Sequence, residues 1–242
     1  MKIPLGITLE VEIWKKSSAQ AAAKFVKADM VVGLGSGTTA AYVVRTLARS
    51  KSRAIFIPSS SATQKLASEL DLKLGSLGNH PKLDLMIDGA DEVDPDFNMI
   101  KGRGGAQTRE KILASAARKV VIGADRTKLV NQLGERTPVP VEVLPFAHKF
   151  TMQKFAELKG EPKLRITTTG APFVTDNGNY IIDVKFASIP RPAELEEAIN
   201  RMLSVVENGL FVGVADVVLV GHECGCTTLR SKQDFLKFVR HR

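Results

Sequence analysis

The chain has 242 residues, 44% of them hydrophobic, which is enough for one large domain or for a large domain with a small companion. No apolar run approaches the roughly 18 residues of a membrane-spanning helix, and Glu10 and Glu12 interrupt the N-terminal segment where a signal peptide needs an apolar core. The net charge of +8 is spread along the chain, and the only dense basic cluster is residues 237–242. We therefore expect a soluble, cytoplasmic protein that binds neither membrane nor nucleic acid and whose positive field attracts a small anionic substrate.

Short apolar runs with the length of buried strands recur in the first half of the chain, at residues 30–34, 54–57, 83–87 and 120–122. Helix-like segments precede and separate them, at residues 14–26, 38–49, 61–70 and 106–117. Alternation of buried strands with helices is typical of βαβ units. It predicts an α/β fold with a Rossmann-like, mostly parallel sheet.

The pattern changes at residues 137–145, where three prolines interrupt it. The elements predicted after this point are a helix at 146–158, a strand at 164–168, a turn at 176–179, a strand at 180–186 and an amphipathic helix that begins at Pro192. This order predicts a smaller inserted α+β (ferredoxin-like) domain.

The apolar runs at residues 210–214 and 217–220 again have the character of buried strands, and we expect both to rejoin the main sheet. The predicted domains are therefore a Rossmann-like catalytic domain of residues 1–136 plus 208–242 and a small α+β domain of residues 137–207.

Residues 33–39, Gly-Leu-Gly-Ser-Gly-Thr-Thr, connect a predicted strand to a predicted helix. Glycines let a backbone approach a ligand closely, and the N–H groups at a helix start attract anions. The glycine spacing does not match the dinucleotide fingerprint, and the lysine of a P-loop is missing, so a single phosphate fits best. The structural alternative is a tight turn in which Thr38 is the helix N-cap.

Asp88 and Asp91 follow the predicted strand 83–87, with further acidic residues close behind them. One aspartate at a strand end commonly caps a turn. A concentration of carboxylates is more typical of a metal site or of a site for a hydroxyl-rich ligand. Lys101 supplies compensating positive charge nearby and favours the hydroxyl-rich ligand.

Residues 101–105, Lys-Gly-Arg-Gly-Gly, form a second glycine-rich segment that leads into a helix. Taken alone, it fits a loop with a solvated lysine. Glu110 comes near the first turn of the following helix, where an acidic residue stabilises the helix dipole. Its place after the glycines also allows it to act as a general base. We interpret Cys224 and Cys226, whose spacing suits neither a disulfide nor zinc, as small buried apolar residues.

At these motifs the chain resembles the A type of ribose-5-phosphate isomerase. The resemblance rests on GLGSGTTA at 33–40, IDGADEVD at 87–94, KGRGGAQTREK at 101–111, PVPVEV at 138–143 and TDNGNYIID at 175–183. These motifs occur in the order and spacing of the family, and the resemblance covers about residues 14–242.

The resemblance implies interconversion of D-ribose 5-phosphate and D-ribulose 5-phosphate through an enediolate, in the pentose phosphate pathway, with no cofactor or metal and as a homo-oligomer (dimer or tetramer). It implies that Glu110 accepts the proton, that Lys101 stabilises the oxyanion, and that Asp88 and Asp91 orient hydroxyl groups. The substrate-binding residues that it implies are Ser36, Gly37, Thr38, Thr39, Asp88, Gly89, Ala90, Asp91, Lys101, Gly102, Arg103, Gly104 and Lys128. The role of Arg103 is left open, and Lys15 is a further candidate for the phosphate.

Two alternatives remain open at this point. A non-catalytic sugar-phosphate sensor of the same fold would keep the phosphate loop but would need neither Lys101 nor Glu110. A related sugar-phosphate deaminase or lactonase would need a different set of bases.

Overall fold

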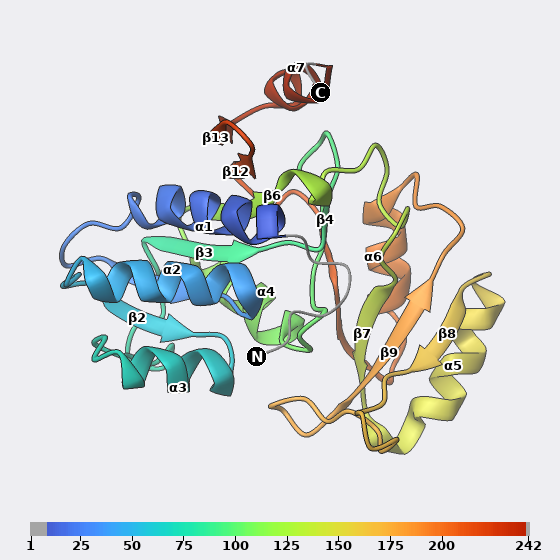
Figure 1. Ribbon diagram of the computed structural model, residues 1–242. Coiled ribbons are helices and arrows are strands. Elements are labelled where there is room, and N and C mark those ends of the chain that lie inside the picture. The colour runs from blue at the N-terminus through green and yellow to red at the C-terminus, as the bar shows by residue number, and fades with distance from the viewer. Residues whose placement is uncertain (1–8, 241–242) are drawn as a thin grey trace. The chain divides into compact units, whose positions relative to one another are not determined.

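The structure, a computed structural model, describes residues 9–240 (Figure 1). Residues 1–8, which include part of the segment weighed as a signal peptide, and the last two residues of the basic cluster 237–242 lie outside this range. The contacts divide the described chain into two compact units. The first unit contains residues 9–89, 113–129 and 215–240, and the second contains residues 90–112 and 130–214.

The first unit is built on a six-stranded sheet with the strand order β13-β12-β6-β3-β1-β2. Its strands are β1 (Val31–Leu34), β2 (Ile55–Pro58), β3 (Leu85–Gly89), β6 (Val120–Asp125), β12 (Val217–His222) and β13 (Gly225–Leu229). All of the pairings are parallel except that of β13, which runs antiparallel to β12. The strands predicted in the first half of the chain are confirmed, and so is the return of residues 217–220 to this sheet.

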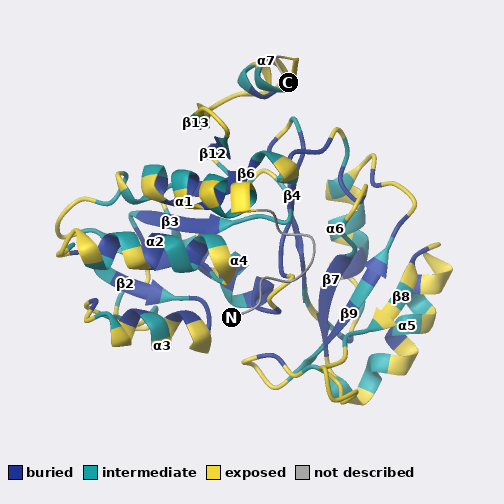
Figure 2. Ribbon diagram, in the orientation of Figure 1, coloured by how far each residue is buried: buried dark blue, intermediate teal, exposed yellow. Residues whose placement is uncertain are grey.

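The helices α1 (Leu9–Ala23), α2 (Gly37–Arg49) and α3 (Ser61–Glu69) run along this sheet (Figure 1). The buried residues of α2 recur at helical spacing. Val43, Val44 and Leu47 pack in one apolar cluster with residues of α1 and with strand residues such as Leu34 and Ile87. Figure 2 shows the strands as largely buried and the outward faces of these helices as exposed. A Cβ on Gly33 would point to the opposite side of the sheet, where its neighbours would include Leu113 of α4 (Gln107–Ala116). The apolar core of this unit therefore fixes the sheet on which the glycine-rich loop stands.

The order of the parallel strands creates a switch point at β1. Strand β2 pairs with one edge of β1 and β3 pairs with the other, so the chain builds the sheet in one direction and then in the opposite one. Open α/β sheets bind ligands outside the carboxyl ends of their strands at such a point. The segments that begin at Gly35 and Asp88 lie at these two strand ends.

The second unit contains the sheet β10-β7-β9-β8, which is antiparallel throughout. Its elements in chain order are β7 (Val139–Val143), α5 (His148–Glu157), β8 (Glu161–Leu164), β9 (Tyr180–Lys185), α6 (Pro192–Asn200) and β10 (Val205–Asn208). This βαββαβ order is that of a ferredoxin-like fold, as predicted. The predicted helix at 146–158 is a short 3-10 turn, Pro145–Ala147, followed by α5. The strand predicted at 164–168 was placed too late, because β8 ends at Leu164.

A small three-stranded sheet, β11-β5-β4, completes the second unit. It joins β4 (Glu92–Val93), β5 (Met99–Ile100) and β11 (Leu210–Phe211). The prediction that residues 210–214 return to the main sheet was wrong, because Leu210 and Phe211 pair with β5 instead. The same pairing explains why the contacts group residues 90–112 with residues 130–214. The predicted boundaries put residues 90–112 in the Rossmann-like domain instead. The assignment of folding domains stays a prediction.

Among the described helices, none combines the length and the apolar character needed to cross a membrane.

Candidate active site

The first unit carries a backbone loop that is open to an anion at the end of β1. Gly37 has a φ of +85°, which favours glycine, and a Cβ placed there would meet nothing within 4 Å. Helix α2 begins at Gly37, and its N-cap is Ser36. The structural alternative in which Thr38 is the N-cap was therefore wrong. The Ser36 side chain accepts no hydrogen bond from the first turn, and Gly37 and Thr38 are exposed. Backbone N–H groups at such a helix start attract a negative charge.

Asp88 ties this loop to the end of β3. Its carboxylate accepts hydrogen bonds from Ser36 N at 3.2 Å and from Gly89 N at 2.7 Å. Gly35 N donates to Ile87 O at 2.9 Å, and a Cβ on Gly35 would overlap the Asp88 carboxyl group. Glycine is therefore required at position 35 for the two strand ends to approach each other this closely.

Lys128 follows β6 on a single 3-10 turn, Arg126–Lys128. The buried carboxylate of Asp125 accepts a hydrogen bond from Thr127 N at 2.9 Å and a second one from the Thr127 hydroxyl, which together fix this turn. Lys128 is half-buried at the carboxyl end of the strand beside β3. Thr39 lies over Gly89 of β3 and Gly123 of β6 in the same part of the sheet. A Cβ on Gly123 would come within 3.1 Å of Thr39 Cγ2.

Lys15, the further phosphate candidate, already has an acidic partner. Its Nζ atom lies 2.8 Å from Glu12 Oε1 within α1. Burial raises the pKa of Glu12, but the hydrogen bonds from Lys15 and Tyr42 outweigh burial, so the net pKa lies below its ordinary value. A role of Lys15 in phosphate binding stays a prediction.

The second unit contains a buried ion pair that joins Lys101 to Glu110. Lys101 Nζ donates to Glu110 Oε2 at 2.9 Å, and the two residues are only 4% and 2% exposed. Lys101 follows β5, where its N–H group donates to Gly209 O at 2.9 Å, and Glu110 lies in the first turn of α4. The interpretation of Lys101 as a solvated loop residue was therefore wrong. Burial of opposite charges is costly in solvation free energy, so a pair of this kind is a candidate for chemistry.

The backbone of residues 102–105 is held on one side by Arg165, which donates to Gly102 O at 3.1 Å and to Arg103 O at 3.0 Å. On the other side, Arg103 N donates to Asp91 Oδ2 at 3.1 Å. Within residues 9–240 no hydrogen bond uses the N–H groups of Gly102 and Gly104. Of these two residues, Gly104 is exposed and Gly102 is buried.

The side chain of Arg103 is exposed, and with Arg136 and Arg165 it lines a cavity of about 380 Å³ in the second unit. Ala90, the first residue of this unit, is half-buried. No group of three or more His, Cys, Asp or Glu side chains suited to a metal ion occurs in the described part of the chain.

The structure thus places the predicted residues in two sets, each within its own unit. The first set contains Ser36, Gly37, Thr38, Thr39, Asp88, Gly89 and Lys128. The second contains Ala90, Asp91, Lys101, Gly102, Arg103, Gly104 and Glu110. Sequence reasoning missed Arg165, which holds the backbone of Gly102 and Arg103.

Known proteins share this architecture. The family model described as Ribose 5-phosphate isomerase A (phosphoriboisomerase A) matches residues 55–225. Ribose-5-phosphate isomerase A of Thermosynechococcus vestitus is 49% identical, over 87% of this chain and 92% of that protein. The chain belongs to the ribose 5-phosphate isomerase A family, which confirms the resemblance seen in its motifs.

Solved structures agree. Ribose 5-phosphate isomerase A from Methanocaldococcus jannaschii is 40% identical with a TM-score of 0.86, covering 90% of this chain and 98% of that one. A D-ribose-5-phosphate isomerase in complex with phospho-erythronic acid is also 40% identical, with a TM-score of 0.89 over 92% of this chain and 100% of that one. The predicted α/β fold class is confirmed.

Proposed function

We propose that this protein is a ribose-5-phosphate isomerase, which interconverts D-ribose 5-phosphate and D-ribulose 5-phosphate through an enediolate intermediate. Membership of the family supports this reaction and not the sensor alternative. The structural observation that carries the proposal is the buried pair of Lys101 and Glu110, which combines a base with a cation at 2.9 Å. A sensor would have no use for this costly arrangement.

Glu110 acts as the general base. Isomerisation of an aldose to a ketose removes a proton from C2 and returns it to C1, so one carboxylate that reaches both carbons can perform both steps. Before transfer, the positive charge of Lys101 is balanced by the Glu110 carboxylate. After transfer Glu110 is neutral, and Lys101 balances the negative charge that has formed on the enediolate. The net charge of the buried volume stays constant, and this favours the reaction in a place of low dielectric constant.

The amides of Gly102 and Gly104 assist Lys101 in stabilising the enediolate oxygen, because donors already aimed at a developing charge need no reorganisation. Asp91, which Arg103 N holds in place, and Asp88 accept hydrogen bonds from substrate hydroxyl groups and help to relay their protons. Ala90 and Gly89 contribute backbone contacts. The side chain of Arg103 faces solvent and is given no catalytic role.

The phosphate of the substrate binds at the loop that begins α2. Ser36, Gly37, Thr38 and Thr39 supply backbone N–H groups and hydroxyls, and Lys128 supplies a positive charge. The left-handed backbone of Gly37 and the exposure of Gly37 and Thr38 at the start of α2 support this assignment. The relative that was solved in complex with phospho-erythronic acid, a phosphorylated acid, supports a sugar phosphate as the ligand of this protein.

We further propose that the protein acts in the cytoplasm, in the non-oxidative pentose phosphate pathway, as a homo-oligomer. In the second unit Phe146 and Leu203 are fully exposed and Phe150 is 57% exposed. Apolar side chains left in water support a subunit contact on this unit. Light scattering of the purified protein measures the mass of the assembly, and a monomer at micromolar concentration contradicts this part of the proposal.

A coupled assay that detects ribulose 5-phosphate tests the function. We expect turnover of ribose 5-phosphate that is unchanged by a chelator, because the proposed chemistry needs neither metal nor cofactor. Binding of ribose 5-phosphate without turnover supports the sensor instead. Preferred turnover of an amino sugar phosphate or a lactone supports the deaminase or lactonase alternative.

A further inference from the structure

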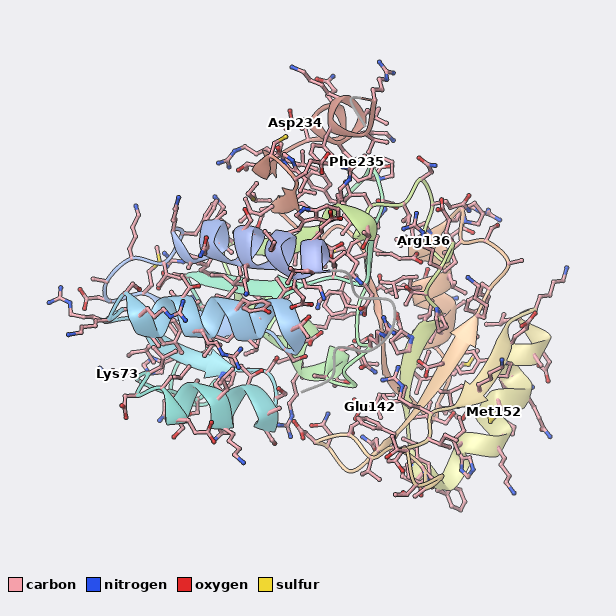
Figure 3. All side chains as sticks on the ribbon, in the orientation of Figure 1. Lys73, Arg136, Glu142, Met152, Asp234 and Phe235 are labelled. Carbon is pink, nitrogen blue, oxygen red and sulfur yellow. The ribbon has the colours of Figure 1, made fainter. Side chains whose placement is uncertain are left out.

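Glu142 is a buried carboxylate for which the proposed reaction has no role. It lies in β7 with an exposed fraction of 0% and is labelled in Figure 3. Side chains alternate along a strand, and Val139, Val141 and Val143 all enter the apolar cluster that includes Phe155 of α5. Glu142 therefore projects from the opposite face of the sheet. A charged group buried in this way needs partners, or its desolvation destabilises the fold.

The partners of Glu142 are neutral hydrogen-bond donors from two other segments. Its Oε1 atom accepts from Thr175 Oγ1 at 2.9 Å, from Asn177 Nδ2 at 3.1 Å and from Asn179 Nδ2 at 2.8 Å. Its Oε2 atom accepts from the hydroxyl of Thr108. Glu142 thus joins the turn that precedes β9 to the first turn of α4.

Two further residues of α4, Arg109 and Lys111, are each held by two hydrogen bonds. Arg109 donates to Asn177 Oδ1 at 2.7 Å and to Asp176 O at 2.8 Å. Lys111 donates to Glu196 at 2.7 Å and to Glu207 at 2.8 Å. Residues 108, 109 and 111 are therefore all attached to neighbouring elements of the second unit. Successive helical residues point about 100° apart, so these attachments fix the direction of the residue between them, Glu110.

We propose that Glu142 is a positioning residue for the catalytic base. Directly through Thr108, and indirectly through Asn177 and Arg109, it fixes the rotation of α4 that presents Glu110 to Lys101. This inference rests on the proposed isomerase function. It also explains why the motifs at 101–111, 138–143 and 175–183 occur together: each supplies part of one hydrogen-bond network.

Thr108→Val and Glu142→Gln test the inference. Valine keeps the shape of threonine but removes the hydroxyl that reaches Glu142. Glutamine keeps the length of glutamate but replaces one acceptor oxygen with an NH₂ donor. At the Oε1 position this group opposes the amide donors of Asn177 and Asn179, and at the Oε2 position it makes the Thr108 hydroxyl turn round to accept. We expect kcat for ribose 5-phosphate to fall by about 10- to 100-fold, because small displacements of a reacting group are costly in rate. KM should change by less than about threefold, since neither residue contacts the substrate.

Thr151→Val is the matched control. Thr151 is, like Thr108, a buried helical threonine of the second unit. Its hydroxyl bonds to Ser204 Oγ at 2.6 Å and to Ala147 O at 2.9 Å, and neither partner belongs to the network that holds α4. The control loses the same chemical group, so its melting temperature should fall as in Thr108→Val while its kcat stays within about twofold of the wild type.

A second readout separates position from stability. With ribose 5-phosphate deuterated at C2, the isotope effect on kcat should rise in Thr108→Val, because proton transfer becomes slower relative to the other steps. Thr151→Val should leave the isotope effect unchanged.

The inference is wrong if folded Thr108→Val and Glu142→Gln retain the kcat of Thr151→Val. Should Glu142→Gln fail to fold, Thr108→Val alone decides. Absence of turnover in the wild-type protein refutes the proposed function and the inference with it, whereas an active wild type with unaffected variants refutes the inference alone.

Discussion

The ammonium group of Lys101 and the carboxylate of Glu110 come from residues nine positions apart and meet at 2.9 Å, with almost no access to solvent. Lys101 Nζ also lies 5.1 Å from the centroid of the Phe211 ring, so one side of the pair faces an aromatic surface. An ion pair shielded in this way is sensitive to the loss of either partner.

Glu110→Gln should lower kcat for ribose 5-phosphate by about 10²–10⁴-fold, because the amide cannot accept the proton from carbon. Binding of ribose 5-phosphate, measured by calorimetry, should persist because the phosphate loop is untouched. Near wild-type turnover in this variant would remove Glu110 as the base.

Lys101→Ala should slow catalysis more than it weakens binding. The ammonium group balances the charge of the enediolate, which exists only after proton transfer. The separate changes in kcat and KM from initial rates test this expectation. A rise in KM with an unchanged kcat would contradict a role in stabilising the oxyanion.

Removal of one partner from the buried pair should also destabilise the protein. Lys101→Met and Glu110→Leu should each lower the free energy of unfolding by about 3–5 kcal/mol, whereas the double variant should lose less than the sum of the two. Urea denaturation of the four proteins in this cycle measures the coupling. Additive losses would show that the two charges do not interact in solution.

Gly35→Ala should disrupt the phosphate loop, because the added Cβ would collide with the Asp88 carboxyl group. We expect a loss of about 1–3 kcal/mol in unfolding free energy and weaker binding of ribose 5-phosphate. Gly78→Ala is the control in the same unit, since a Cβ there would meet only Ser76 Oγ at 3.9 Å. Equal affinities of the two variants would show that the loop tolerates a side chain at position 35.

The cysteines should differ in reactivity towards iodoacetamide. Cys224 is exposed, contrary to its interpretation as a buried residue, whereas Cys226 is partly buried. Burial raises the pKa of the Cys226 thiol to about 11. At pH 8 a thiol with that pKa is ionised in only about one molecule in a thousand, and the thiolate is the reactive form. Mass mapping should find Cys224 alkylated first, and faster modification of Cys226 would contradict the assigned environments.

The periodic parts of the fold were predictable from the sequence, because buried parallel strands and amphipathic helices leave strong local patterns. Strand β7 was missed because Pro138 and Pro140 argue against a central strand. The structure tolerates Pro140 because β10 pairs only as far as Val141, and beyond that point the Pro140 carbonyl accepts from Gly209 N. Strands β4 and β5 have two residues each, too few to show any periodicity.

The candidate site was predictable in its residues but not in its environment. The motifs identified Lys101 and Glu110, but the burial of Lys101 depends on the pairing of β5 with β11, from a distant part of the chain. Glu142 gave no local signal, since its donors lie 33 to 37 residues away in sequence. Only the folded sheet and turn bring those donors to it.

The peptide group between Gly102 and Arg103 is held at both ends, its oxygen by Arg165 and its N–H by Asp91. Rotation of this group by half a turn would break both contacts at once. The plane of this peptide is therefore fixed by the protein itself. In the proposed site, a substrate would meet this peptide dipole already oriented, and none of its binding energy would be needed to turn the group.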